Sequence, residues 1–183
     1  RLNYSVTKLF SSSAEANFFF STGVYRDLSG WYHVVWKQGS GTATVYVNGV
    51  AAAGATASVS GDTAVNNSVQ HCIGGASNTL GESPLKAYLA ETIMIDGTAL
   101  GPDSFGEEKN GVWIPKDASG LTFGTNGFHL DYADSSALGN DVSGNNNDWT
   151  PINITTHDKM LDSPTFNSDS NGGNMCTWNP LDK

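Results

Sequence analysis

The chain has 183 residues, of which 38% are hydrophobic and only 15% charged, with 21 glycines. This composition excludes a charge-rich disordered chain and a helical bundle, and favours turn-rich β structure in one domain, or in one domain plus the start of a second. The formal net charge of -9 at pH 7 repels phosphate backbones and anionic membrane surfaces, so we expect no nucleic-acid partner.

The first half of the chain, to about residue 95, consists of short apolar or alternating runs separated by Gly, Ser, Asn and Asp clusters, a pattern typical of a β-sandwich or barrel. The clearest unit is a β-hairpin of residues 31–37 and 42–47 around the turn 38–41. Asn48-Gly49 predicts a second tight turn. Alternation with a period of two places one set of side chains in the core: Tyr32, Val34 and Trp36 on the first strand, and Ala43, Val45 and Val47 on the second.

Further strands are predicted at residues 17–21, 68–73 and 87–95, and residues 55–60 are a weaker candidate because Ala and Ser fit a pleated surface poorly. Residues 101–107 begin Gly-Pro-Asp, which predicts one helical turn before the apolar run 112–115.

The chain becomes polar from Asp131 onward, and residues 134–148 are predicted to form a loop. Residues 165–174, rich in Asn, Asp, Ser and Gly, resemble a linker that leads towards residues 178–181.

Three segments carry a resemblance to a known family: residues 30–35 (Gly-Trp-Tyr-His-Val-Val), 45–50 (Val-Tyr-Val-Asn-Gly-Val) and 89–100, the last followed by a Pro-Asp-Ser-Phe turn. In order and spacing they resemble the laminin-G-like jelly roll of the concanavalin A-like lectin/glucanase superfamily, over about residues 25–106. The resemblance implies an all-β fold, an antiparallel jelly-roll β-sandwich with an extended C-terminal segment.

The resemblance also implies a domain organisation. We predict a laminin-G-like sandwich over residues 1–132, with the family's earlier strands expected before residue 1. Residues 133–183 are predicted to form an Asn/Asp/Gly-rich loop and linker that leads to a further domain.

Later runs resemble the end of such domains in phage tail-fibre and other virion structural proteins: residues 111–116, 124–131 and 143–149. In those proteins, stretches like 161–165 and 179–182 often lead into a further sandwich of the SPRY type. The resemblance implies a virion structural or adhesion module on the particle surface, whose partners are other virion proteins, copies of itself and host-surface glycans. The alternative is a carbohydrate-binding domain of a secreted glycan-active enzyme.

Catalysis by a retaining glucanase needs two carboxylates about 5 Å apart across the substrate cleft. In the glucanase branch of the family they come from a Glu-x-Asp-x-x-Glu strand motif, and the comparable place here is Glu91 and Asp96. A spacing of five residues puts these side chains on opposite faces of a strand, so we expect no enzyme activity. The resemblance implies instead a structural Glu91, whose half-buried carboxylate caps backbone amides.

Other catalytic and metal patterns are missing from the sequence. The four histidines lack zinc-ligand spacing, and no serine occupies a Gly-x-Ser-x-Gly elbow. Two cysteines, Cys72 and Cys176, build neither a disulfide framework nor a multi-cysteine metal site. No stretch approaches the ~18 apolar residues of a membrane span, so no membrane insertion is expected.

The acidic loop supplies oxygen ligands of the kind that Ca²⁺ prefers, and two glycines, Gly139 and Gly144, allow the backbone to fold around an ion. No cofactor is predicted beyond this candidate Ca²⁺. The competing interpretation, which we favour, is that these side chains form turns and caps. The candidate ligands are Asp131, Asp134, Asn140, Asp141, Asn145 and Asp148.

Aromatic side chains in or beside predicted loops are the candidate carbohydrate-binding residues, because flat rings stack on the apolar faces of sugars. They are Tyr25, Trp113, Tyr132 and Trp149. The competing interpretation is that each ring fills the core or a contact with a neighbouring domain. Phe18, Phe20 and Trp178, where the domain's own core does not cover them, are expected to be covered by a second chain or by the next domain.

Overall fold

The structure is a computed structural model that describes residues 25, 27, 30–58, 70–75, 85 and 87–159, with the backbone alone for residues 55–58. Within these residues the regular structure consists of β-strands and two 3-10 helices. No helix among them is long and apolar enough to cross a membrane.

Two units divide the chain. One comprises Arg1–Lys86 and Ala99–Trp113, and the other comprises Ala87–Thr98 and Ile114–Lys183. The second unit therefore includes residues on both sides of the domain boundary predicted at residue 132, and that boundary stays a prediction.

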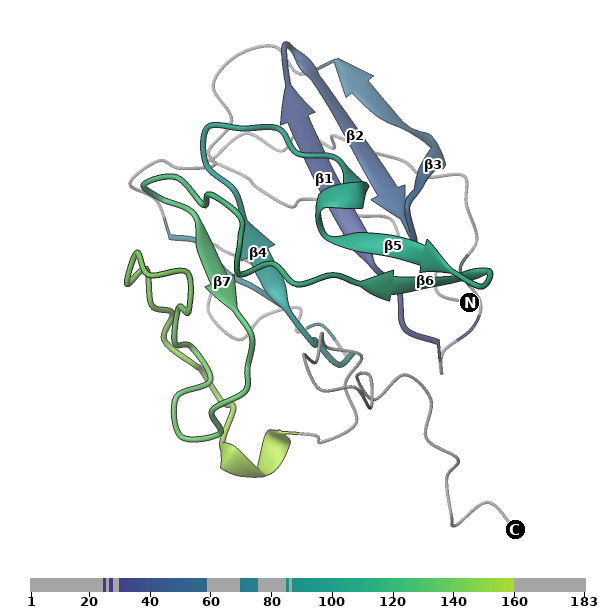
Figure 1. The fold of residues 1–183 in the computed structure, drawn as a ribbon. Helices are drawn as coiled ribbons and strands as arrows, with labels where there is room; N and C mark the ends of the chain where they lie inside the picture. The colour runs from purple at the N-terminus through teal and green to yellow at the C-terminus, as the bar shows by residue number, and fades with distance from the viewer. Residues whose placement is uncertain are drawn as a thin grey trace, which may run out of the picture. The chain divides into compact units, whose positions relative to one another are not determined.

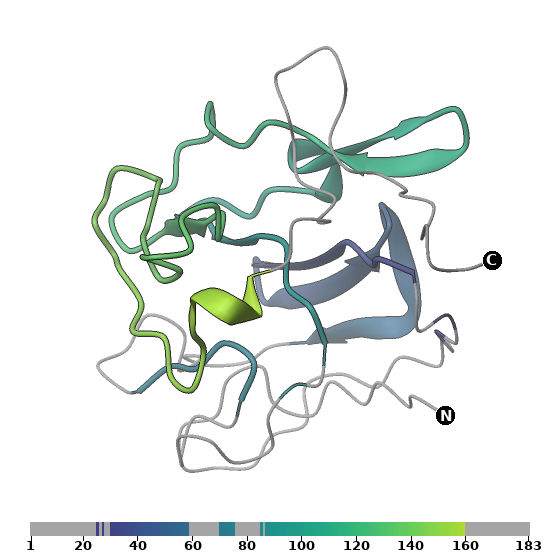
Figure 2. The same cartoon turned by 90° about the horizontal axis from the view of Figure 1, so that it is seen from below.

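Three antiparallel strands form a sheet in the first unit, in the order β1 (Val34–Gly39), β2 (Thr42–Val47) and β3 (Val50–Ser58) (Figure 1). Figure 2 shows the same strands, in blue, from below. Both connections are two-residue turns with positive φ at each position: 52° and 74° at Ser40 and Gly41, and 48° and 81° at Asn48 and Gly49. Such turns match the twist of paired strands. The predicted hairpin and the Asn48-Gly49 turn are confirmed, the first turn being shorter than expected.

The third strand begins earlier than the weak candidate at 55–60, because the Asn48-Gly49 turn returns the chain directly into pairing with β2. The pairing register shifts between Thr44 and Tyr46. Gly54, with φ of 72°, lies on the longer side of this shift, where a bulge needs a residue that tolerates a left-handed backbone.

The predicted core face of the hairpin is confirmed in part. Val45 pairs with Trp36 and Val47 with Val34, so these side chains share one face as expected. Ala43 is fully buried and Val45 is 6% exposed. In the first unit, the buried side chains of the described residues thus centre on β2, the central strand.

Tyr32 and Val34 were wrongly predicted to be buried, since their exposed fractions are 37% and 57%. Val34 is the first residue of β1, at the end of the sheet, and Tyr32 precedes the strand. Val35, on the opposite face, is only 8% exposed. The sheet thus buries side chains on both faces, and alternation identifies only which residues share a face.

Other predicted strands are corrected by the structure. Residues 70–73 form no strand, and residues 17–21 and 68–69 lie outside the described residues. The predicted strand 87–95 shortens to β4 (Thr92–Met94), because the residues before it have no strand partner and Tyr88 is 68% exposed. The helical turn in 101–107 is confirmed as a 3-10 helix, Pro102–Ser104, with proline in its first turn.

A hairpin of β5 (Gly106–Lys109) and β6 (Val112–Pro115) was not predicted from the sequence (Figure 1). Its turn is Asn110-Gly111, with φ of 53° and 80°. The Asn-Gly dipeptide, which also forms the turn at residues 48–49, could therefore have predicted this hairpin from the sequence.

In the second unit, β4 pairs antiparallel with β7 (Phe128–Leu130), which the sequence also did not predict. All three residues of β7 are buried, and Leu130 is 2% exposed. A buried strand of three residues shows no alternation, so the pattern gave no signal. The predicted loop at 134–148 is confirmed, since it contains no strand or helix.

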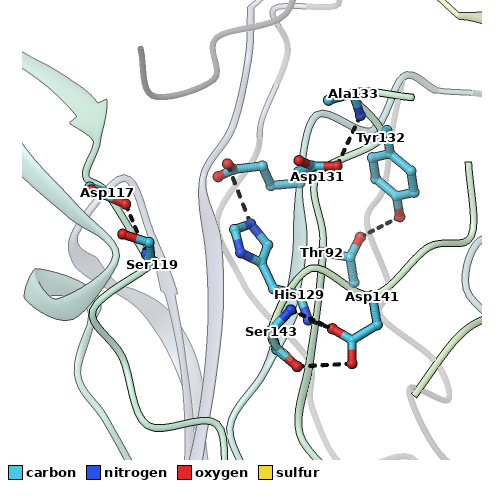
Figure 3. Close-up of polar contacts among 10 residues, drawn as sticks. Thr92, Asp117, Ser119, His129, Asp131, Tyr132, Ala133, Asp141 and Ser143 are labelled. Carbon is cyan, nitrogen blue, oxygen red and sulfur yellow. Dashed lines mark hydrogen bonds and ion pairs between the residues drawn. The ribbon is translucent and has the colours of Figure 1, made fainter. Parts of the chain in front are cut away.

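A single buried carboxylate joins this loop to β7 (Figure 3). Asp141 Oδ1 accepts hydrogen bonds from the backbone N–H groups of His129 and Ser143, at 2.8 and 2.9 Å. Its Oδ2 accepts from Ser143 Oγ and from the N–H of Asn147, also at 2.8 and 2.9 Å. A carboxylate offers about four acceptor sites, so the acceptor capacity of Asp141 is used in full.

Two asparagine side chains extend the attachment. The Nδ2 atoms of Asn145 and Asn147 both donate to the carbonyl of Gly127, at 2.9 Å, and also reach the carbonyls of Gly124 and Thr125. The loop is thus held by amide and carboxylate hydrogen bonds to backbone groups, which explains how it keeps a defined conformation with few apolar side chains.

We expect Asp141→Asn to lower the free energy of unfolding by about 2–4 kcal/mol. The amide retains only one acceptor oxygen, and each buried donor left unpaired costs roughly 1–3 kcal/mol. Chemical denaturation at pH 7 measures the change. Asp134→Asn is the matched control: Asp134 is an exposed cap, an asparagine can make the same cap, and its effect should stay below about 0.5 kcal/mol.

The same variant tests the pH dependence of stability. Burial by itself raises the pKa of Asp141, but the hydrogen bonds from His129, Ser143 and Asn147 outweigh it and hold the pKa below the ordinary 3.8. A carboxyl with a lowered folded-state pKa stabilises the fold above about pH 4, and this contribution is lost as the pH falls through the folded value. The parent chain should therefore lose more stability between pH 7 and 3 than Asp141→Asn. Equal losses would contradict this role.

Candidate functional site

Five of the six predicted calcium ligands use their side chains in hydrogen bonds to backbone groups. Asp131 Oδ1 accepts from the N–H of Ala133, and Asp134 Oδ1 from the N–H and Oγ of Ser136. Both are Asx-type turns of the kind the competing interpretation expected. Hydrogen bonds from Ser136 lower the pKa of Asp134, and Lys159 contributes further.

The remaining candidates lie around Asp141. Asp148 Oδ1 accepts from the N–H of Asp141 at 2.8 Å, and Asn145 is bonded to backbone carbonyls. Asn140 is exposed, with its N–H bonded to the carbonyl of Ala137. In the described ranges no three His, Cys, Asp or Glu side chains gather to hold a metal ion. Calcium binding by this loop stays a prediction, and it would require Asp141 to give up hydrogen bonds.

Because Asp141 has no acceptor site left, we expect chelation to leave stability unchanged. Thermal unfolding with EDTA, and again after excess Ca²⁺ is restored, measures this. A ligand that binds only the folded state raises the melting temperature by mass action, so a rise with Ca²⁺ that Asp141→Asn abolishes would contradict the expectation.

Among the candidate sugar-binding rings, Trp113 packs against backbone. Its indole lies against Gly49 and Gly106, and a methyl group on either glycine would overlap the ring. The His33 ring lies 5.8 Å from it between centroids. These contacts favour the core interpretation for Trp113.

Tyr132 and Trp149, both in the second unit, are half-buried. The Tyr132 hydroxyl lies 2.7 Å from Thr92 Oγ1 (Figure 3), and burial raises the pKa of this phenol although the Thr92 hydrogen bond opposes the shift. Trp149 meets Phe128 edge to face, with centroids 5.1 Å apart. Each ring is thus engaged with a strand residue.

Tyr25 belongs to an aromatic group that the sequence did not single out. Its ring meets Tyr32 edge to face, with centroids 5.4 Å apart. Trp31 and Tyr32 expose 41% and 37% of their surfaces. We call Tyr25, Trp31 and Tyr32 the aromatic segment.

Asp27 is positioned beside the aromatic segment. The Tyr32 hydroxyl donates to its backbone carbonyl at 3.0 Å, and its carboxylate lies against Gly30, where an added Cβ would come within 2.8 Å of Oδ2. Just beyond, the N–H of His33 donates to Asn48 Oδ1 and the N–H of Asn48 to the carbonyl of His33. The start of β1 is thereby tied to the second turn of the sheet.

The two acids compared with a glucanase pair have separate partners. Glu91 is half-buried as expected, but its Oε1 faces His129 Nε2 at 3.6 Å rather than backbone amides. The expected capping of amides is therefore wrong, because the imidazole from β7 lies next to it. Asp96 Oδ2 accepts from the N–H and Nδ2 of Asn126, at 3.1 and 3.0 Å. It holds the turn before β7.

A family model described as the Concanavalin A-like lectin/glucanases superfamily matches residues 4–104, more than half of the chain. No curated protein and no solved structure matches the chain. The family match and the antiparallel strands confirm the predicted fold class, an all-β sandwich of the concanavalin A-like type. The chain belongs to the concanavalin A-like lectin/glucanases superfamily.

Proposed function

We propose that the chain is a non-enzymatic module that binds glycans through the aromatic segment. The observation that carries this proposal is the exposure of Trp31 and Tyr32 next to Asp27, whose backbone carbonyl binds Tyr32 and whose carboxylate lies against Gly30. A lectin-type fold alone does not establish binding, since function depends on the site.

The chemistry of the aromatic segment suits a sugar. Exposed rings offer flat apolar faces to the C–H groups of a pyranose, and tyrosine adds a polar edge. A nearby carboxylate accepts hydrogen bonds from sugar hydroxyls. The edge-to-face contact with Tyr25 and the bond to Asp27 restrain Tyr32, so binding costs less side-chain entropy.

The arrangement of acids supports the non-enzymatic part of the proposal. Glycoside hydrolysis needs one carboxyl group that donates a proton and another that acts on the sugar carbon or on water. Glu91 faces an imidazole and Asp96 binds Asn126, so each is engaged in holding unit two together. Neither arrangement resembles a pair of acids held free for a substrate.

We further propose that the module is part of a virion structural or adhesion protein, where it contacts other virion proteins and copies of itself. The motifs in the second half of the chain that resemble virion proteins support this, as do exposed apolar side chains such as Val50 and Val112, at 70% and 57%. Phe18, Phe20 and Trp178, also expected at such contacts, lie outside the described residues. A carbohydrate-binding domain of a secreted enzyme is the alternative.

Trp31→Ala should weaken glycan binding about five- to thirtyfold, since it removes a stacking face worth roughly 1–2 kcal/mol. Calorimetry with a hit from a glycan array measures the change. Tyr88→Ala is the matched control, because Tyr88 is also an exposed ring, at 68%, but is not part of the aromatic segment.

Two results would contradict the binding proposal: no glycan bound by the parent chain, or equal loss in Trp31→Ala and Tyr88→Ala. Its non-enzymatic part fails if the chain releases reducing sugar from a polysaccharide panel and Glu91→Gln abolishes the release.

For the virion proposal, we expect mass spectrometry of purified particles to find this chain in several copies per particle. Symmetric assemblies repeat the same contact, so the copy number should be a multiple of a small integer. Its absence from particles, together with its presence in a secreted glycan-active enzyme, would favour the alternative.

A further inference from the structure

A hollow of about 230 Å³ lies on one face of the three-stranded sheet. Its polar lining comes from β1, β2 and the turn between them. Lys37 pairs with Thr44 and Gly39 with Thr42, so the polar side chains of β1 and β2 in this lining project to the same face. The lining side chains with polar groups are Lys37, Ser40, Thr42, Thr44 and Tyr46.

Lys37 is the unusual member of this lining. It is half-buried, and among the described residues its ammonium group forms no ion pair, although the chain has 18 acidic residues. Lysine is seldom withdrawn from water without a partner. The hollow therefore holds a positive charge that an anionic ligand can neutralise.

Three of the hydroxyl groups around Lys37 are also available. Within the described part of the chain, the side-chain hydroxyls of Ser40, Thr42 and Tyr46 form no hydrogen bond. Each can donate one hydrogen bond and accept others. A cation bordered by several open hydroxyls matches a ligand that carries both an anionic group and hydroxyls.

We propose that this hollow binds one acidic sugar residue, with its carboxylate or sulfate on Lys37 and its hydroxyls on Tyr46 and Thr42. The inference rests on the proposed glycan-binding function and adds to it a second subsite, on the three-stranded sheet. The volume is below the roughly 300–1,000 Å³ of common small-molecule sites, so a single sugar of a longer glycan is the occupant. Ammonium–anion hydrogen bonds are about twice as strong as neutral ones, so the acidic group dominates selectivity.

Calorimetry on the full chain tests this with matched probes: 3′-sialyllactose and galacturonate oligomers for carboxylate, a chondroitin sulfate tetrasaccharide for sulfate, and lactose as the neutral sugar. We expect at least one acidic probe to bind tenfold or more tightly than lactose. Lys37→Met should remove this preference, and Lys37→Arg should retain it. Lys109→Met, at an exposed lysine of β5, should leave it unchanged. Tyr46→Phe should weaken acidic probes about fivefold.

The outcomes separate this inference from the proposed function. If lactose and acidic probes bind equally, or if Lys37→Met and Lys109→Met have the same effect, the acidic subsite is wrong while glycan binding stands. If no saccharide binds, both are wrong. Each variant should have the same melting temperature as the parent chain. A loss of affinity then reports on binding and not on folding. Preference for the sulfated over the carboxylated probes, or the reverse, identifies which anion the subsite takes.

Discussion

The second unit depends on the hydrogen bonds that the Asp141 carboxylate accepts. Four donors converge on it, three of them backbone N–H groups, and one of those belongs to β7. A polar loop of this composition buries too little apolar surface to order itself by packing. Hydrogen bonding to one buried anion replaces that packing, because an ionised acceptor holds its donors more strongly than a neutral group does.

Local turn chemistry was readable from the sequence, whereas contacts between distant segments were not. The hairpin of β1 and β2 and the Asn48-Gly49 turn follow from strand propensity and from residues that tolerate positive φ. β7 was missed because three buried residues carry no periodicity, and its partner β4 lies far away in the sequence. The buried face of β1 was misjudged at Val34 and Val35 because burial depends on what covers each face.

In the candidate site, too, local features could be predicted from the sequence and tertiary features could not. The sequence indicated that rings near loops matter, but exposure separates Trp31 and Tyr32 from Trp113, and exposure is a tertiary property. The Asn and Asp residues of the loop read equally well as ion ligands and as caps. Only the structure shows that Asp141 has used its acceptor sites on backbone N–H groups and on the Ser143 hydroxyl. Lys37 gave no signal either, since a lysine in a strand is ordinary until its surroundings are known.

The Trp113 ring and the two glycines beneath it have a consequence for the evolution of this chain. Neither Gly49 nor Gly106 can acquire a side chain while the indole is in place, and replacing the indole by a smaller side chain leaves a cavity that larger residues at 49 or 106 can refill. The three positions are expected to covary, although the two glycines lie 57 positions apart in the sequence. Homologous sequences should therefore keep all three residues or change them together.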